Sequence, residues 1–245
     1  MILKINNKSD FVSNFLSPLH KVGDSCICKV TPEGITSLIA TECKTVVLYG
    51  SYSQNLDVDE DGTTLNIPDL GRLIRILQCI DVNELELDVT PSYIKYSSDD
   101  IRFTYHLLDD NILSSPKLSI DKIKQIEYNT TFTVPYTSII NLLKSSTFTI
   151  NINKVYFDTV DDSVYAEIND KQTSMVDNIR IKLCDSFDGC QITTPLPVSL
   201  DTIRNLSGIK CSNLKVSINS ELNVMTFSIN SNNIKVIYII SGLIK

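Results

Sequence analysis

The chain has 245 residues, of which 42% are hydrophobic, and its formal net charge is −7. This length allows two domains of about 120 residues each or one large β domain, and the hydrophobic fraction is sufficient for a core. The acidic balance argues against a protein that coats nucleic acid or a membrane with its whole surface, although a local basic face can exist within an acidic total.

Targeting and redox signals are few. No apolar run approaches the roughly 20 residues that a membrane-spanning helix needs, and the segment 1–6 lacks the features of a signal peptide. We therefore expect a protein without a membrane part that is not secreted and that works in the cytoplasm of a cell or of a virus-infected host. The seven cysteines show no paired spacing typical of metal sites. Cys26 and Cys28 fit one face of a strand, as reduced and partly buried thiols.

The first predicted unit is a helix followed by three strands. The helix covers 10–22 and has an apolar stripe that begins at Phe11, but Pro18 is expected to end or kink it within about two turns. Pro32–Gly34 has the composition of a tight turn. The three strands are predicted at 25–30, 35–41 and 44–52, and an acidic loop follows at 57–62.

The stretch 69–81 has a clear helical pattern. Asp69 occupies the position of an N-cap, where its side chain can accept hydrogen bonds from the first backbone amides. Apolar residues then recur at three- and four-residue steps and form one face, at Leu70, Leu73, Ile74, Leu77 and Ile80. Arg72 and Arg75 project from the other side, and no acid within the helix neutralises them. Three strands are predicted after this helix, at 84–90, 93–96 and 100–107.

The second half of the chain shows the same pattern twice more. A third helix starts near 135–138, and strands are predicted after it at 148–153, 155–159, 164–169 and 179–184. A fourth helix starts at 199, and strands are predicted after it at 214–219, 224–229 and 233–240. The helix starts are about sixty to seventy residues apart, which is the spacing that two duplicated domains would give.

These elements predict an α+β fold of two duplicated domains, each with two short helices packed on antiparallel β-sheets. The domains are expected at 1–110 and 135–245. Turn-forming residues interrupt the pattern between them, and we place an interdomain connector at 111–134.

The charges are distributed unevenly between helices and strands. The four helical stretches (10–22, 69–81, 136–147 and 199–210) hold six of the 22 basic residues and four of the 29 acidic residues, a net charge of +2. The other 16 basic and 25 acidic residues give the rest of the chain a net charge of −9. The helix acids lie at or near helix ends, where the helix dipole favours them. The helices could carry a few solvated cations by chance, or they could form a basic face for a polyanion.

This plan resembles that of the ring-shaped DNA sliding clamps, with a PCNA-like fold. In that family a continuous sheet forms the outside of the ring and basic helices line the hole. The chain length resembles the trimeric type, and the stretch Asp69-Leu-Gly-Arg-Leu-Ile-Arg-Ile-Leu is similar to the second helix of the T4-like phage clamp. Asp61–Gly62 before this helix and Pro116 in the connector are further parallels, and a composition rich in Asn, Ile, Ser and Lys fits a bacteriophage origin.

The resemblance implies a homotrimer that encircles double-stranded DNA without sequence specificity and tethers the replicative DNA polymerase as a processivity factor, after loading by an ATP-dependent clamp loader. It implies that the helix cations contact DNA phosphates, namely Arg72, Arg75, Lys144, Arg204, Lys21 and Lys210. It also implies an apolar pocket beside the connector for a polymerase or clamp-loader tail, which by position would involve Ile112, Leu113, Leu196, Pro197 and Tyr238. Ordinary core packing is the alternative interpretation of these five residues.

The sequence offers little for other functions. Asp57, Asp59 and Asp61 imitate the start of an EF-hand loop, but Pro68 stands where a bidentate Glu is required, so a surface turn is the better interpretation. His20 and His106 have no Cys partner at metal or nucleophile spacing, and we expect no metal, no cofactor and no enzymatic activity. A β-rich oligomeric phage structural protein without a DNA function is the alternative. A single-strand-binding module would need aromatic residues among basic ones on a strand face.

Overall fold

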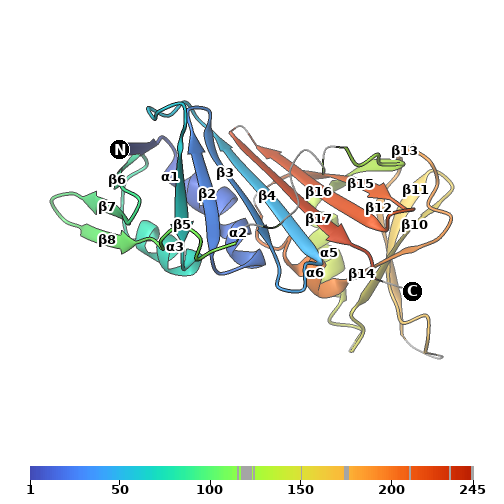
Figure 1. Ribbon diagram of the computed structural model, residues 1–245. Helices are drawn as coiled ribbons and strands as arrows, with labels where there is room; N and C mark the ends of the chain where they lie inside the picture. Colours follow the sequence, from blue (N-terminus) through green and yellow to red (C-terminus); the bar gives the residue numbers. More distant parts are fainter. Residues whose placement is uncertain are drawn as a thin grey trace. The chain divides into compact units, whose positions relative to one another are not determined.

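The computed structural model (Figure 1) describes the chain except for residues 115, 117–122, 124, 150, 174–176, 210, 232 and 244–245. Its contacts divide the chain into two units. Unit 1 contains residues 1–119 and 230–236, and unit 2 contains residues 120–229 and 237–245. The first division therefore falls inside the stretch 111–134 that the sequence predicts as a connector.

The described residues of unit 1 form two antiparallel sheets and two helical segments. One sheet has the strand order β1-β6-β7-β8, and in the other β4, β3, β2 and β5 follow one another. The first helical segment is continuous and consists of α1 (Lys8–Asp10), the π-helix η1 (Phe11–Leu16) and α2 (Ser17–Val22), and the second is α3 (Leu70–Gln78). The strands are β1 (Ile2–Ile5), β2 (Cys26–Thr31), β3 (Gly34–Ala40), β4 (Val46–Ser53), β5 (Thr63–Ile67), β6 (Leu85–Val89), β7 (Tyr93–Ser97) and β8 (Arg102–His106).

Unit 2 repeats this plan. One sheet has the order β12-β11-β10-β14, and in the other β13, β9, β15, β16 and β17 follow one another. Its helices are α5 (Tyr136–Ser145) and α6 (Leu200–Arg204). The strands are β9 (Thr130–Pro135), β10 (Lys154–Val160), β11 (Ser163–Ile168), β12 (Ile179–Cys184), β13 (Asp188–Gly189), β14 (Leu196–Ser199), β15 (Asn213–Asn219), β16 (Val224–Ser231) and β17 (Ile234–Ser241). The end of β16 and the start of β17 fall within residues 230–236, which the contacts assign to unit 1.

The two units correspond element by element. In the described residues of unit 1 the first strand is followed by a helical segment, four strands, a helix and three strands. From β9 onwards the described residues of unit 2 have this order too, with the two-residue β13 added. The sheet orders correspond as well, because β1-β6-β7-β8 matches β9-β15-β16-β17 and β4-β3-β2-β5 matches β12-β11-β10-β14. The prediction of two duplicated α+β units is confirmed.

The first helix extends to Val22, the predicted end, so Pro18 does not end it earlier. Proline has no N–H group, and inside a regular α-helix its ring would clash with the carbonyl four residues earlier. The π-helical stretch η1 precedes Pro18, and the backbone N–H of Ser17 donates to the carbonyl of Val12, five residues earlier. The wider helical turn thus accommodates the proline.

Other predicted boundaries also differ from the structure. The sequence predicts a strand at 148–153, but the described residues of this stretch form no strand, with Phe148 62% exposed and Asn151 at a φ of +68°. The end of the expected connector forms β9, and the sequence prediction did not include β1, β13 or β14. None of the described helices is both long and apolar enough to cross a membrane.

Each unit has its own apolar core. In unit 1, Phe15 and Leu70 are fully buried, so both helical segments pack an apolar side inward. In unit 2, Phe157 and Phe227 meet edge to face with their ring centroids 6.5 Å apart. The cationic side chains on the other sides of these helices, such as Arg72, Arg75, Lys144 and Arg204, are exposed.

Candidate nucleic-acid interface

The start of α3 is fixed by hydrogen bonds from three parts of unit 1. The side chain of Asp69 accepts from the backbone N–H of Arg72 at 2.7 Å, which confirms the predicted N-cap. The hydroxyl of Tyr105 on β8 donates to the carbonyl of Asp69 at 2.7 Å and accepts from its amide at 3.0 Å. The amide of Leu70 donates to the carbonyl of Asp24, just after α2, at 2.7 Å. These bonds set the position of the helix and therefore of its polar side.

Arg72 and Arg75 are both exposed on this polar side of α3. Within the described residues, no carboxylate oxygen lies within 4.0 Å of either guanidinium. The opposite side is the predicted apolar face, with Leu70, Leu73 and Leu77 buried. The α3 side chains therefore present two cations that the described part of the chain does not pair.

The helix α2 adds a third basic residue and a histidine. Lys21 is exposed, and desolvation lowers the pKa of its amine. His20 packs over α3: a Cβ atom added to Gly71 would lie 2.9 Å from its Nε2 atom. The Nδ1 atom of His20 lies 3.6 Å from Oδ1 of Asp24. Glycine at position 71 thus allows the close crossing of α2 and α3 beside the arginines.

The predicted DNA-binding residues of unit 2 differ in their surroundings. Lys144 is exposed in the last turn of α5, and its carbonyl accepts a hydrogen bond from the Thr147 hydroxyl at 2.8 Å. Arg204 is also exposed, but its guanidinium forms an ion pair with Asp201 one turn earlier on α6. Lys210 lies outside the described residues. The helix charges predicted a basic α6, whereas the structure pairs its arginine with an acid.

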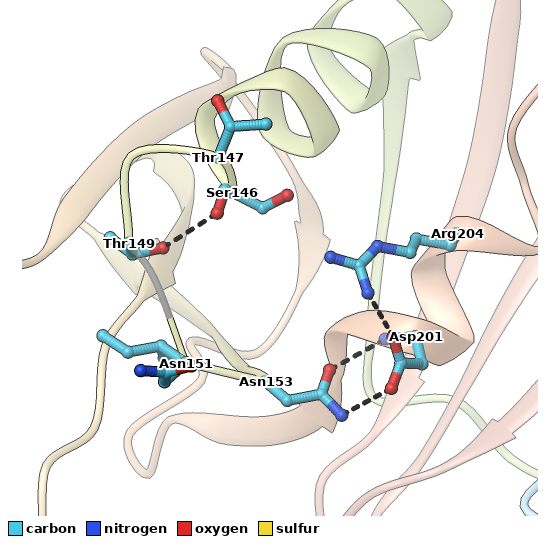
Figure 2. Close-up of a pocket in the computed structure, with 8 residues that line it drawn as sticks. Ser146, Thr147, Thr149, Asn151, Asn153, Asp201 and Arg204 are labelled. Atoms are coloured by element: carbon cyan, nitrogen blue, oxygen red, sulfur yellow. Dashed lines mark hydrogen bonds and ion pairs between the residues drawn. The ribbon is translucent and has the colours of Figure 1, made fainter.

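A polar hollow of about 330 Å³ lies beside Arg204 in unit 2. Figure 2 shows Arg204 and Asp201, from α6, facing the turns that follow α5. The Asn153 side chain holds Asp201 by two hydrogen bonds, one from its Nδ2 atom to Oδ2 of Asp201 at 2.7 Å and one from the Asp201 amide to its Oδ1 atom at 3.0 Å. The sequence did not reveal this arrangement, because Asn153 and Asp201 are 48 positions apart.

The residues predicted to bind a partner protein are placed in different environments. Ile112 is 60% exposed and Leu113 is half-buried, and both belong to unit 1. Leu196, Pro197 and Tyr238 are buried in unit 2. The Tyr238 hydroxyl donates to the carbonyl of Asn205 at 3.3 Å, and burial raises its pKa. Burial favours a core role for these three residues, whereas Ile112 is open to a partner.

The described residues clarify the other candidate sites. Gly62 has a φ of +66°, and its amide donates to the carbonyl of Asp59 at 2.8 Å, so the acidic loop contains the surface turn predicted there. Cys26 and Cys28 are buried as free thiols on one face of β2, as predicted. Their sulfur atoms lie 3.6 Å apart, and the hydrogen bond with Cys26, together with burial, raises the pKa of Cys28. Within the described ranges, no group of three or more His, Cys, Asp or Glu side chains converges as a metal site would require.

This duplicated arrangement of sheets and helices is the PCNA-like DNA clamp fold. A structure of A. fulgidus PCNA, with the C-terminal region of FEN-1 bound, matches 100% of this chain and 98% of that chain, with a TM-score of 0.77 and 14% identity. PCNA from Entamoeba histolytica matches 99% of this chain and 98% of its own, with a TM-score of 0.78 and 12% identity. A chain in a PCNA2-PCNA3 complex from Sulfolobus tokodaii matches 99% of this chain and 99% of its own length, with a TM-score of 0.75 and 12% identity. No family model and no curated protein matches the sequence.

Proposed function

We propose that this chain is a ring-shaped DNA sliding clamp that encircles duplex DNA and tethers the replicative DNA polymerase as its processivity factor. The clamp fold, which extends over both units, carries this proposal. The exposed pair Arg72 and Arg75 on α3 supports it, because these cations have no carboxylate partner among the described residues. In this role the protein acts by enclosing DNA, without covalent chemistry.

The proposed DNA contacts suit a protein that slides. Arg72 and Arg75 are the central contacts, and Lys21, Lys144, Arg204 and Lys210 add to them. Contacts of Lys and Arg with phosphates do not read sequence and weaken as salt rises. A few such contacts per chain give weak binding, so persistence on DNA comes from the closed ring.

The assembly that we propose is a homotrimer, and the sheet edges support pairing between copies. The strands β8 and β12 each end a four-stranded sheet, one in each unit. An open strand edge carries unpaired backbone N–H and C=O groups and can pair with another chain. Since the two edges belong to different units, pairing β8 of one copy with β12 of the next is a head-to-tail contact, which can close into a ring.

The proposed protein partners are the DNA polymerase and an ATP-dependent clamp loader. The exposed side chain of Ile112, next to Leu113, is the proposed start of their docking surface. The similar A. fulgidus structure has the C-terminal region of FEN-1 bound, which supports docking of a partner's terminal segment. We place the protein in the T4-like phage type of clamp, in the cytoplasm of the infected host cell.

The first test measures mass and topology together. Light scattering across a concentration series should give three times 27.4 kDa, and a clamp loader with ATP should leave the protein on nicked circular duplex DNA in high salt. Linearising that DNA should release the protein, because a ring slides off free ends. A stable monomer at tens of micromolar, or no retention on circles, would overturn the proposal, and an open-ended assembly would favour the structural-protein alternative.

A further inference from the structure

The ion pair on α6 gives the two units different basic surfaces. In unit 1 the described residues leave Arg72 and Arg75 without a carboxylate within 4.0 Å, whereas in unit 2 Arg204 is paired with Asp201. We propose that Asp201 is a built-in counter-ion that competes with DNA phosphates for Arg204, in the hollow beside it. This inference rests on the proposed function, and it identifies Asp201 as a residue that weakens DNA binding through Arg204.

Asp201 is held in place, whereas Arg204 is held by Asp201 alone in the described contacts. Both side-chain atoms of the Asn153 amide bond to Asp201, one to the carboxylate and one to the backbone amide. The carboxylate is therefore oriented before it meets the guanidinium, and its other oxygen accepts from Arg204. The side chains of Arg204 and Asp201 are 53% and 63% exposed, so the pair is near water and can open at little cost.

The hollow offers space and hydrogen-bond donors for a phosphate group. Arg204 projects towards it (Figure 2), and a guanidinium has five N–H donors, of which Asp201 uses one in the described contacts. The hydroxyls of Ser146, Thr147 and Thr149 already donate to backbone carbonyls, so each would exchange that bond for one to a phosphate. Arg204 is the cation among the residues that line this hollow, and its charge is balanced by Asp201.

This arrangement reduces the contribution of unit 2 to DNA binding. A cation that leaves an internal carboxylate to meet a phosphate exchanges one anionic partner for another and gains less than an unpaired cation. Salt dependence reports this difference, because the slope of log K against log salt changes by about 0.9 for each phosphate that is neutralised. Removing the carboxylate should therefore tighten binding and steepen the slope.

The test compares Asp201→Asn with a matched charge change elsewhere in unit 2. Asp201→Asn keeps a side-chain oxygen for Asn153 and removes the charge that pairs with Arg204. Asp162→Asn, at the exposed turn between β10 and β11, changes the net charge equally and serves as the control. Affinity for a short linear DNA duplex is measured by NMR titration over a series of NaCl concentrations, in the wild type and in the Arg204→Gln background.

We expect Asp201→Asn to tighten binding by about two- to fivefold, to steepen the salt slope, and to exceed Asp162→Asn in both. In the Arg204→Gln background the excess over the control should disappear. Equal effects of the two Asn variants, or an excess that persists without Arg204, would overturn the inference while the proposed function stands. If the wild type and Asp201→Asn both fail to bind the duplex at low salt, the inference is overturned, whereas the proposed function is decided separately by retention on circular DNA.

Discussion

The hydroxyl of Tyr105 bonds to the backbone of Asp69 twice, donating to its carbonyl at 2.7 Å and accepting from its amide at 3.0 Å. Tyr105→Phe removes both bonds at the start of α3. We expect the free energy of unfolding to fall by about 1–2 kcal/mol, because the Asp69 amide and carbonyl lose their partner. Urea unfolding measures this change, and Tyr93→Phe on the neighbouring strand β7 is the control. Equal effects of the two variants would show that the hydroxyl does not stabilise the helix start.

Alkaline pH should weaken the contribution of the Tyr105 hydroxyl to the free energy of unfolding. Burial raises the pKa of Tyr105, whereas in the unfolded chain a tyrosine titrates near pH 10. The folded state therefore favours the neutral hydroxyl, so its contribution is complete below about pH 10 and is lost as pH rises towards the folded-state pKa. The difference in unfolding free energy between wild type and Tyr105→Phe should shrink between about pH 8 and about pH 11. Urea titrations at both pH values measure it, and a constant difference would contradict this linkage.

The turn between β2 and β3 depends on glycine at position 34. Gly34 has a φ of +141°, and an added Cβ would lie 2.1 Å from the carbonyl oxygen of Tyr52. Gly34→Ala should therefore destabilise the protein by at least about 1–3 kcal/mol. Gly23→Ala is the control, because Gly23 has an extended φ of −167° and an added Cβ would meet the movable end of the Ile39 side chain. Thermal unfolding of both variants tests the difference, and equal melting temperatures would contradict it.

Local signals in the sequence were sufficient to predict the element that carries the candidate site. Asp69 and the apolar steps after it predict α3, and the same spacing places Arg72 and Arg75 on its exposed side, as the structure has them. These features could be predicted because the N-cap and the apolar periodicity of a helix depend on residues that are close together in the sequence. The strand β14 was missed because Pro197 argues against a strand, and the structure pairs Pro197 with Tyr156 at the edge of a sheet, where a proline is tolerated.

Contacts between distant parts of the chain could not be predicted in this way. Nothing near Asp201 in the sequence shows that Asn153 binds it, or that the carboxylate then faces Arg204. The burial of Tyr238 likewise depends on how α6 packs, since its hydroxyl reaches the Asn205 carbonyl just after that helix. Charge counting along the helices therefore gave Arg72 and Arg204 equal weight, although their surroundings differ.

The basic pair on α3 should set much of the affinity for DNA. Replacing Arg72 and Arg75 with Glu should weaken DNA binding and lower the salt slope by about 1 for each phosphate that is no longer neutralised. The trimer should remain intact, because neither arginine lies on the strands β8 or β12 that we propose to pair. Polymerase stimulation on a primed circle and light scattering measure the two effects, and unchanged stimulation would contradict the assignment.

The outer edge of β8 can be tested through the backbone at Thr104. The amide of Leu107 donates to the carbonyl of Ser92, on the β7 side, and N–H groups alternate in direction along an antiparallel strand. The Thr104 amide therefore points away from β7, towards the open edge. Thr104→Pro removes this donor without breaking the pairing of β8 with β7, and proline is compatible with an edge strand.

We expect Thr104→Pro to give monomers by light scattering while far-UV circular dichroism stays close to that of the wild type. Thr104→Ala keeps the amide and should remain a trimer, which separates the loss of the backbone donor from the loss of the side chain. The monomeric variant should also fail to stay on circular DNA in high salt, because an open chain cannot enclose the duplex. A Thr104→Pro protein that still forms trimers would place the contact between copies elsewhere than on the edge of β8.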